Sequence, residues 1–195
     1  MKKLVVVSAT LLLFAAGAQG GLSVMFDFEG ATLGGAAPDY VASANQRVTD
    51  YMTPLYGSSV TATGAAAWTN NDVGADWDGK TGTDQWLRTY GSASVTPGYF
   101  QISFDTVPVV AGQFQGYVFE ATADADFTIS LYDSGYGDRY NPNPAALIGT
   151  APADFGVGQI VVAFSSLAPI SLMVFSNEGW HDIGIDNLQV TQVPV

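Results

Sequence analysis

Apolar and polar residues alternate with a period of two in seven segments of the chain. These segments are residues 22–29, 99–107, 113–123, 126–133, 159–167, 170–177 and 182–191. A period of two is typical of a β-strand with one buried face. No segment after residue 20 sustains the 3.6-residue apolar period of an amphipathic helix. The pattern therefore predicts a protein built from strands.

Turn-forming residues separate the predicted strands. Glycine, proline, asparagine and aspartate cluster at residues 111–112, 124–126, 134–137 and 141–144. Short strands with such turns between them predict an all-β fold, an antiparallel two-sheet β-sandwich of the jelly-roll type. Residues 30–98 are less regular, with weaker strands near 58–63, 65–69 and 85–90. We expect this region to supply long loops at one end of the sandwich.

The N-terminal segment has the layout of a secretory signal peptide. Two lysines precede the apolar run 4–16, and the small residues Ala16, Gly17 and Ala18 follow. This layout predicts a signal peptide at residues 1–18 and a single β-sandwich domain at residues 19–195. No later segment is long and apolar enough to span a membrane. The protein is therefore expected to be exported, to the cell surface or the extracellular space.

The composition narrows the possible functions. The chain has no cysteine, which excludes disulfides and thiolate chemistry. It has 18 acidic and six basic residues, and two of the basic residues leave with the signal peptide, so the net charge falls from −12 to −14. So negative a protein is not expected to bind nucleic acid or anionic membranes. His181 is the single histidine, and no serine lies in a Gly-x-Ser-x-Gly turn, so an enzyme is not favoured.

Acidic residues interrupt both the first and the last predicted strand. A jelly roll brings these strands together, which places "MFDFEG" (25–30) beside "DIGIDNL" (182–188). Four carboxylates then lie on the faces opposite the apolar side chains: Asp27, Glu29, Asp182 and Asp186. Like charges so close repel one another, and a hard cation with oxygen ligands removes the conflict. The pattern predicts a structural calcium ion held by these four residues.

These two strands also carry a resemblance to a known group of proteins. "DFEG" followed far along the chain by "IGIDNLQV" (183–190) resembles exported bacterial jelly-roll domains, including the PEP-CTERM-sorted proteins and sandwiches like carbohydrate-binding modules. The eukaryotic MAM domain has similar first and last strands. The resemblance implies a calcium ion held by Asp27, Glu29 and Asp186. The sequence ends at Val193-Pro194-Val195 without the sorting tail of PEP-CTERM proteins. Either the protein is released without that sorting step or the tail is missing from this sequence, so sorting by that route is unsupported.

Two groups of aromatic and polar residues are candidates for ligand binding. The acidic loop 70–84 contains Asp76, Trp77 and Asp78, and a glycine-rich turn carries Tyr136, Arg139 and Tyr140. Sugar rings stack on aromatic faces while nearby polar groups bond their hydroxyls. The alternative is a solvated loop and tyrosines that cap strand ends. Whether the loop 70–84 also binds a second cation is left open.

The sequence as a whole favours a secreted, non-catalytic, calcium-stabilised β-sandwich that binds an extracellular polysaccharide. Two alternatives remain. A small carbohydrate-active enzyme needs only two carboxylates across a cleft, and the chain has many. A purely structural subunit of a surface layer or matrix needs no small ligand.

Overall fold

The computed structural model describes residues 21–28, 40–63, 65–69, 85–89, 99–118, 126–139, 141–154, 158–177 and 183–194. The predicted signal peptide and the acidic loop 70–84 lie outside these residues. The elements, in chain order, are β1 (Ser23–Phe26), α1 (Tyr40–Tyr56), β2 (Val60–Thr63), β3 (Ala65–Thr69), β4 (Gln85–Thr89), β5 (Tyr99–Phe104), β6 (Val109–Val118), β7 (Asp126–Tyr132), η2 (Ser134–Tyr136), β8 (Gly137–Asp138), β9 (Asn141–Pro142), η3 (Pro144–Ala146), β10 (Leu147–Asp154), β11 (Gly158–Ile170), β12 (Leu172–Asn177) and β13 (Ile183–Gln192).

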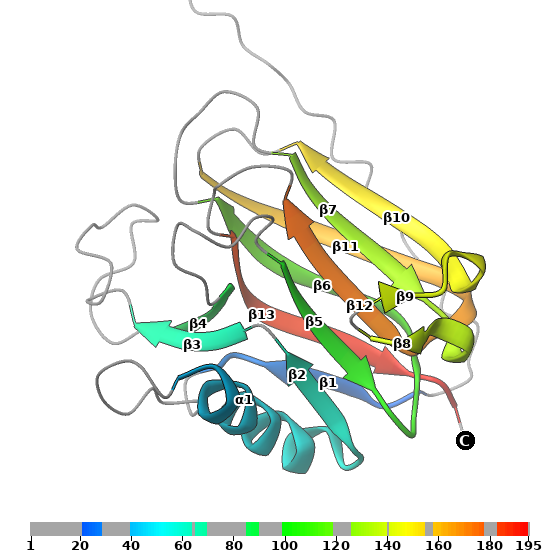
Figure 1. Cartoon of the computed structure of the whole chain (residues 1–195), viewed down its shortest axis with the longest axis horizontal. Coiled ribbons are helices and arrows are strands. Elements are labelled where there is room, and N and C mark those ends of the chain that lie inside the picture. Colours follow the sequence, from blue (N-terminus) through cyan, green and yellow to red (C-terminus); the bar gives the residue numbers. More distant parts are fainter. Residues whose placement is uncertain are drawn as a thin grey trace, which may run out of the picture.

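The strands form two sheets that pack face to face (Figure 1). Sheet A has the order β11-β6-β13-β4-β3, and β1 also pairs with β13. Sheet B has the order β10-β7-β12-β5-β2. Strands β8 and β9 make a separate small hairpin, and every pair is antiparallel. The fold is therefore the all-β sandwich that the alternating pattern predicted.

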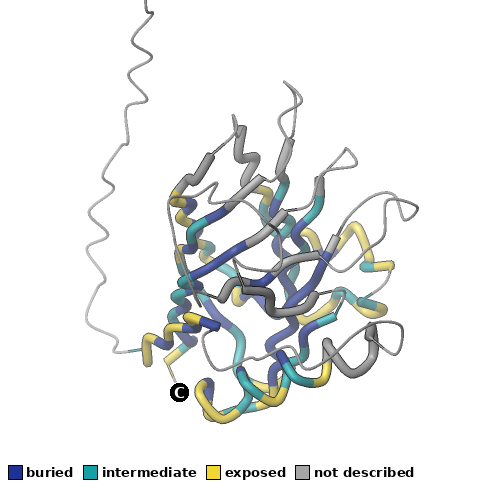
Figure 2. The backbone as a smooth tube through the Cα atoms, turned by 90° about the vertical axis from the view of Figure 1, so that its left-hand side faces the viewer, coloured by how far each residue is buried: buried dark blue, intermediate teal, exposed yellow. Residues whose placement is uncertain are grey.

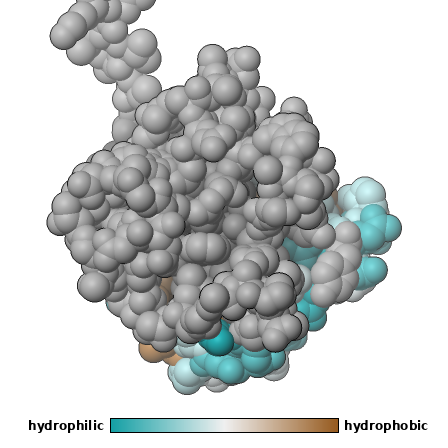
Figure 3. All heavy atoms as spheres, turned by 60° about the vertical axis from the view of Figure 1, so that its left-hand side comes forward, coloured by the Kyte–Doolittle hydropathy of each residue, from teal (hydrophilic) through white to brown (hydrophobic). Residues whose placement is uncertain are grey.

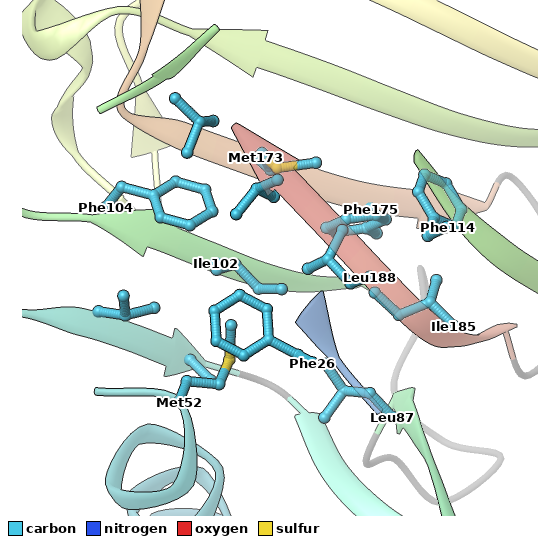
Figure 4. Close-up of a cluster of buried hydrophobic side chains, with 14 of the residues drawn as sticks. Phe26, Met52, Leu87, Ile102, Phe104, Phe114, Met173, Phe175, Ile185 and Leu188 are labelled. Carbon is cyan, nitrogen blue, oxygen red and sulfur yellow. The ribbon is translucent and has the colours of Figure 1, made fainter. Parts of the chain in front are cut away.

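The core lies between the two sheets, where the buried residues gather (Figure 2). Phe175 of β12 stacks on Phe100 of β5, with ring centroids 4.5 Å apart, and meets Phe114 of β6 edge-on at 5.5 Å. Phe26 of β1 and Leu188 of β13 lie in the same cluster (Figure 4). The aromatic contacts therefore cross from sheet B to sheet A and hold the two layers together.

Helix α1 corrects the sequence prediction that residues 30–98 hold only strands and loops. Val48, Met52 and Tyr56 are four residues apart, fall on one face of the helix, and are fully buried or nearly so. Gly57, at φ 74°, ends the helix with a bond from its N–H to the carbonyl of Thr53. Strand β10 was also not predicted. The helix packs along one side of the sandwich, beside β2 and β3 (Figure 1).

The helix also completes the hydrogen bonding of the edge strand β2. The Thr49 hydroxyl accepts a bond from the N–H of Ala62 at 3.0 Å, and the Thr53 hydroxyl donates to the carbonyl of Val60 at 3.2 Å. These two backbone groups belong to β2, the last strand of sheet B. Threonine side chains thus take the place that a further strand would fill. Of the described residues that can be seen in Figure 3, most are hydrophilic.

We expect two tyrosines on α1 to make the folded protein less stable at high pH. Burial raises the pKa of Tyr56 above its usual value of 10.0, and burial together with the bond to Asp27 raises that of Tyr51. Above pH 10 the unfolded chain loses these protons while the folded chain keeps them, so stability is full below pH 10 and falls above it. For Tyr56 the slope is at most about 1.4 kcal/mol per pH unit. Urea unfolding measured below and above pH 10 checks this prediction. The Tyr56→Phe variant should lose less stability above pH 10 than the wild type does. An equal loss in both proteins would contradict the role given to Tyr56.

Candidate functional site

The first and last strands are neighbours, as the sequence predicted. Strand β1 pairs with β13 in an antiparallel register that matches Val24 with Val190 and Phe26 with Leu188. Phe26 and Phe28 are fully buried. Asp27, between them, is exposed, so the apolar and acidic residues of this segment face opposite ways.

Asp27 is tied to helix α1. Its Oδ1 accepts a hydrogen bond of 2.6 Å from the Tyr51 hydroxyl, and that hydroxyl accepts a bond of 3.1 Å from the N–H of Phe28. Phe28 has a φ of 57°, an unusual value for an aromatic residue. The tyrosine therefore fixes both the carboxylate and the backbone at the point where β1 ends.

Asp186 is buried, with only 1% of its surface exposed. Its neighbour Ile185 is also fully buried, although adjacent residues of a strand usually face opposite sides of the sheet. Its Oδ1 accepts a bond of 2.6 Å from the N–H of Asn187, and its Oδ2 accepts one of 2.8 Å from the Asn187 side chain. Asn187 lies in the left-handed region at φ 50°. Here the pairing of β13 with β6 shifts register between Asp186 and Gln189. This is a β-bulge, which bends a strand and redirects its side chains.

The four predicted calcium ligands are placed only in part. Asp27 and Asp186 lie on the paired strands β1 and β13, or directly next to them, whereas Glu29 and Asp182 lie outside the described residues. Within the described ranges, no three histidine, cysteine, aspartate or glutamate side chains gather in a way that suits a metal ion. Calcium at this junction therefore remains a prediction that requires the two acidic residues outside those ranges.

A groove lies beside the bulge, on the outer face of sheet A. Its volume is about 290 Å³, and its described lining comes from four strands: Met25, Gln113, Phe114, Gln115, Val161 and Asn187. Met25 is 53% exposed and Val161 is 61% exposed. We call this the amide groove. It combines two exposed apolar side chains with three side-chain amides.

A row of hydrogen bonds holds one end of the amide groove in place. The Gln113 amide donates to Gln189 Oε1 at 3.1 Å, and the Gln189 amide donates to the Ser23 hydroxyl at 3.0 Å. This row joins β6, β13 and β1. Sequence reasoning missed the groove, although the polar positions of the segment 113–123 place Gln113 and Gln115 on one face of their strand.

The predicted ligand residues of the glycine-rich turn lie on the other sheet. Tyr136 ends η2, Arg139 follows β8, and both side chains are partly buried. Gln101 of β5, which is 2% exposed, donates its side-chain amide to the carbonyl of Arg139. The turn therefore lies over the outer face of sheet B. Tyr140 and the loop residues Asp76, Trp77 and Asp78 lie outside the described residues.

The described strands define an antiparallel two-sheet β-sandwich. No known family model matches the sequence, and no curated protein is significantly similar to it. The chain is similar in structure to the K2 cleaved adhesin domain of Lys-gingipain, with a TM-score of 0.54 and 12% identity over 87% of this chain and 99% of that one. At this identity the likeness shows a shared fold and no more.

Carbohydrate-binding modules are also among the structural neighbours. One is the CBM22-1 xylan-binding domain of Xyn10C from Paenibacillus barcinonensis, with a TM-score of 0.43 and 15% identity over 91% of this chain and 99% of that one. Another is the domain TmCBM61, solved with β-1,4-galactotriose, with a TM-score of 0.37 and 10% identity over 69% and 87% of the two chains. In the part of the chain that the structure describes, no helix has the length and apolar character to cross a bilayer.

Proposed function

We propose that this chain is an exported, non-catalytic protein of the cell surface or extracellular matrix that binds a neutral polysaccharide in the amide groove. The observation that carries the proposal is the groove itself. It is an open depression beside a β-bulge, lined by Gln113, Gln115 and Asn187 between the exposed side chains of Met25 and Val161.

The chemistry of the groove suits a sugar without charge. Each side-chain amide carries two donors and an acceptor, so it pairs with a hydroxyl that donates or accepts. Met25 and Val161 offer apolar contact to the C–H face of a sugar ring. The groove of about 290 Å³ is at the small end of ligand pockets, roughly 300 Å³ upward, and suits about one sugar unit of a longer chain.

The same lining argues against an enzyme. Glycoside hydrolysis needs two carboxyl groups on either side of the bond to be cut. No described lining residue of the amide groove is acidic. The buried carboxylate nearby, Asp186, is held by the backbone and side chain of Asn187. A groove that offers amides and no carboxylate supports binding without catalysis.

Two further parts complete the proposal. A calcium ion joins β1 to β13 through Asp27, Glu29, Asp182 and Asp186, and residues 1–18 direct export. Two other groups, the loop residues Asp76, Trp77 and Asp78 and the turn residues Tyr136, Arg139 and Tyr140, are further candidates for contact with the same polysaccharide. Tyr136 and Arg139 are partly buried on the outer side of sheet B, whereas the amide groove is on sheet A.

A glycan array followed by calorimetry with the best polysaccharide tests this function. Gln113→Ala removes one amide from the groove, and we expect binding to weaken about two- to tenfold, because a neutral hydrogen bond contributes about 0.5–1.5 kcal/mol. The matched control is Gln46→Ala, which removes an exposed glutamine on α1 that bonds Asp50. Binding by the control should equal that of the wild type.

Two results would contradict the proposal, and one would assign the binding site to other residues. Binding to no neutral glycan contradicts it outright. Equal binding by Gln113→Ala, with loss in Trp77→Ala or Tyr136→Ala, assigns the site to the loop 70–84 or to the glycine-rich turn. Release of new reducing ends from a bound polysaccharide would show an enzyme instead.

A further inference from the structure

The two lateral edges of the sandwich differ in how their outermost strands are covered. On one side, α1 lies along β2, and the hydroxyls of Thr49 and Thr53 bond the outward N–H of Ala62 and the outward carbonyl of Val60. Sheet B therefore ends there without free backbone groups at those two positions. On the opposite side lie the last strands of both sheets, β10 and β11 (Figure 1). No other described strand pairs with the outer edge of either.

Strand β10 carries features that discourage a further strand. Pro152 lies inside it and has no N–H to donate, and the strand ends in the charged residue Asp154. Its pairing with β7 also shifts register between Leu147 and Gly149. Proline, charge and bulges are the devices by which natural edge strands avoid pairing with other chains.

Strand β11 lacks these devices over most of its length. It is 13 residues long, GQIVVAFSSLAPI, and none of them is charged. From Gly158 to Ser165 it pairs with β6 in an unbroken register, and the irregularity comes only after Ser165. Val161, Ala163 and Ser165 are exposed on its outer face. An edge strand that is long, regular and uncharged is a template for another strand.

We propose that β11 pairs with β11 of a second copy of this chain, antiparallel, along Gly158–Ser165. An antiparallel pair matches this stretch with itself, so over Gly158–Ser165 neither copy brings a charge, a proline or a register shift into the contact. The whole chain has a net charge of −12, so two copies repel one another over most of their surface. The uncharged edge of β11 is where two such copies approach at the least electrostatic cost, and it supplies the same uncharged stretch to both sides.

The symmetry of the pair has a consequence for the outer faces. Two antiparallel copies of one edge strand that form a closed pair are related by a two-fold axis perpendicular to the sheet. This axis leaves the outer faces of both copies of sheet A on the same side. Both amide grooves, which include Val161 of β11, then open in the same direction.

Sedimentation equilibrium of the purified chain tests the proposal. We expect a two-fold mass for the wild type and the single-chain mass for Ala163→Lys, because in a symmetric pair the added charge enters the interface twice. Ala163→Glu should also be a single chain. An equal mixture of the two variants should recover the two-fold mass, since opposite charges then meet. The matched control, Thr150→Lys on β10, adds the same charge to the neighbouring edge and should keep the wild-type mass.

Other outcomes of these measurements would contradict the proposed β11 pair. A wild type with the single-chain mass at every soluble concentration excludes the pair, and variants that keep the two-fold mass exclude β11 as its interface. If Ala163→Lys fails to fold by circular dichroism, Ser165→Lys serves in its place. The proposal does not depend on glycan binding. A single-chain protein that still binds its polysaccharide refutes the pairing alone, and a paired protein without glycan binding refutes the proposed function alone.

Discussion

Replacement of Phe175 with alanine should lower the free energy of unfolding by about 3–5 kcal/mol. Phe175 has no exposed surface, and its ring contacts both sheets, stacking on Phe100 and meeting Phe114 edge-on. Its removal leaves a cavity where the layers meet and also ends two aromatic contacts. In a chain of this size, about 2–4 °C of melting temperature corresponds to each kcal/mol.

Thermal and urea unfolding measure this loss. Val174→Ala, one residue earlier on β12, is the matched control, because Val174 is only partly buried and lies on the other face of the strand. It should cost less than about 1 kcal/mol. A loss of similar size in both variants would mean that Phe175 does not join the two sheets in the way its contacts indicate.

Calcium should raise the melting temperature of the chain, and a chelator should lower it. A ligand that binds only the folded state stabilises it by about 2.7 kcal/mol at a concentration of 100 times its dissociation constant. The proposed ion joins β1 to β13 and so holds the two ends of the domain together. It also relieves the repulsion among the carboxylates, of which Asp186 is already buried.

The variants Asp186→Asn and Asp50→Asn separate a specific site from a general effect of divalent ions. Both remove one acidic charge, and Asp50 is exposed on α1. The quantity compared is the calcium-dependent change in melting temperature, so any loss of stability from the substitution itself cancels. We expect the change to disappear in Asp186→Asn and to persist in Asp50→Asn. The same melting temperature with calcium and with chelator in the wild type would exclude the ion.

The strands were predictable because burial on one face leaves a two-residue period in the sequence. Each of the seven segments with that period contains a strand among the described residues, and the pairing of β1 with β13 followed from the closure of a jelly roll. Helix α1 was missed for a physical reason. Its buried face uses Val48, Met52 and Tyr56, but its sequence YVASANQRVTDYMTPLY is rich in small and polar residues and includes Pro54. The apolar stripe is therefore too thin to stand out before packing is known.

The candidate sites were predictable to different degrees. The acidic residues at the β1–β13 junction could be recognised from the sequence, because a carboxylate between buried residues needs a partner. The bond from Tyr51 to Asp27 was not, since it depends on the unpredicted helix. The amide groove was missed because its residues Met25, Gln113 and Asn187 come from distant parts of the chain. They meet only through the registers of β1, β6 and β13 and the bulge at Asn187.

The threonines of α1 have a consequence for the size of any assembly. A subunit that can add a neighbour at both sheet ends grows without limit into a fibre or a layer, as a purely structural matrix component requires. Here Thr49 and Thr53 bond an outward N–H and an outward carbonyl of β2, the last strand of sheet B. We therefore expect sheet B to add no neighbour along β2. The proposed β11 pair then presents two copies of the amide groove to a polysaccharide, and sheet B does not extend it past β2.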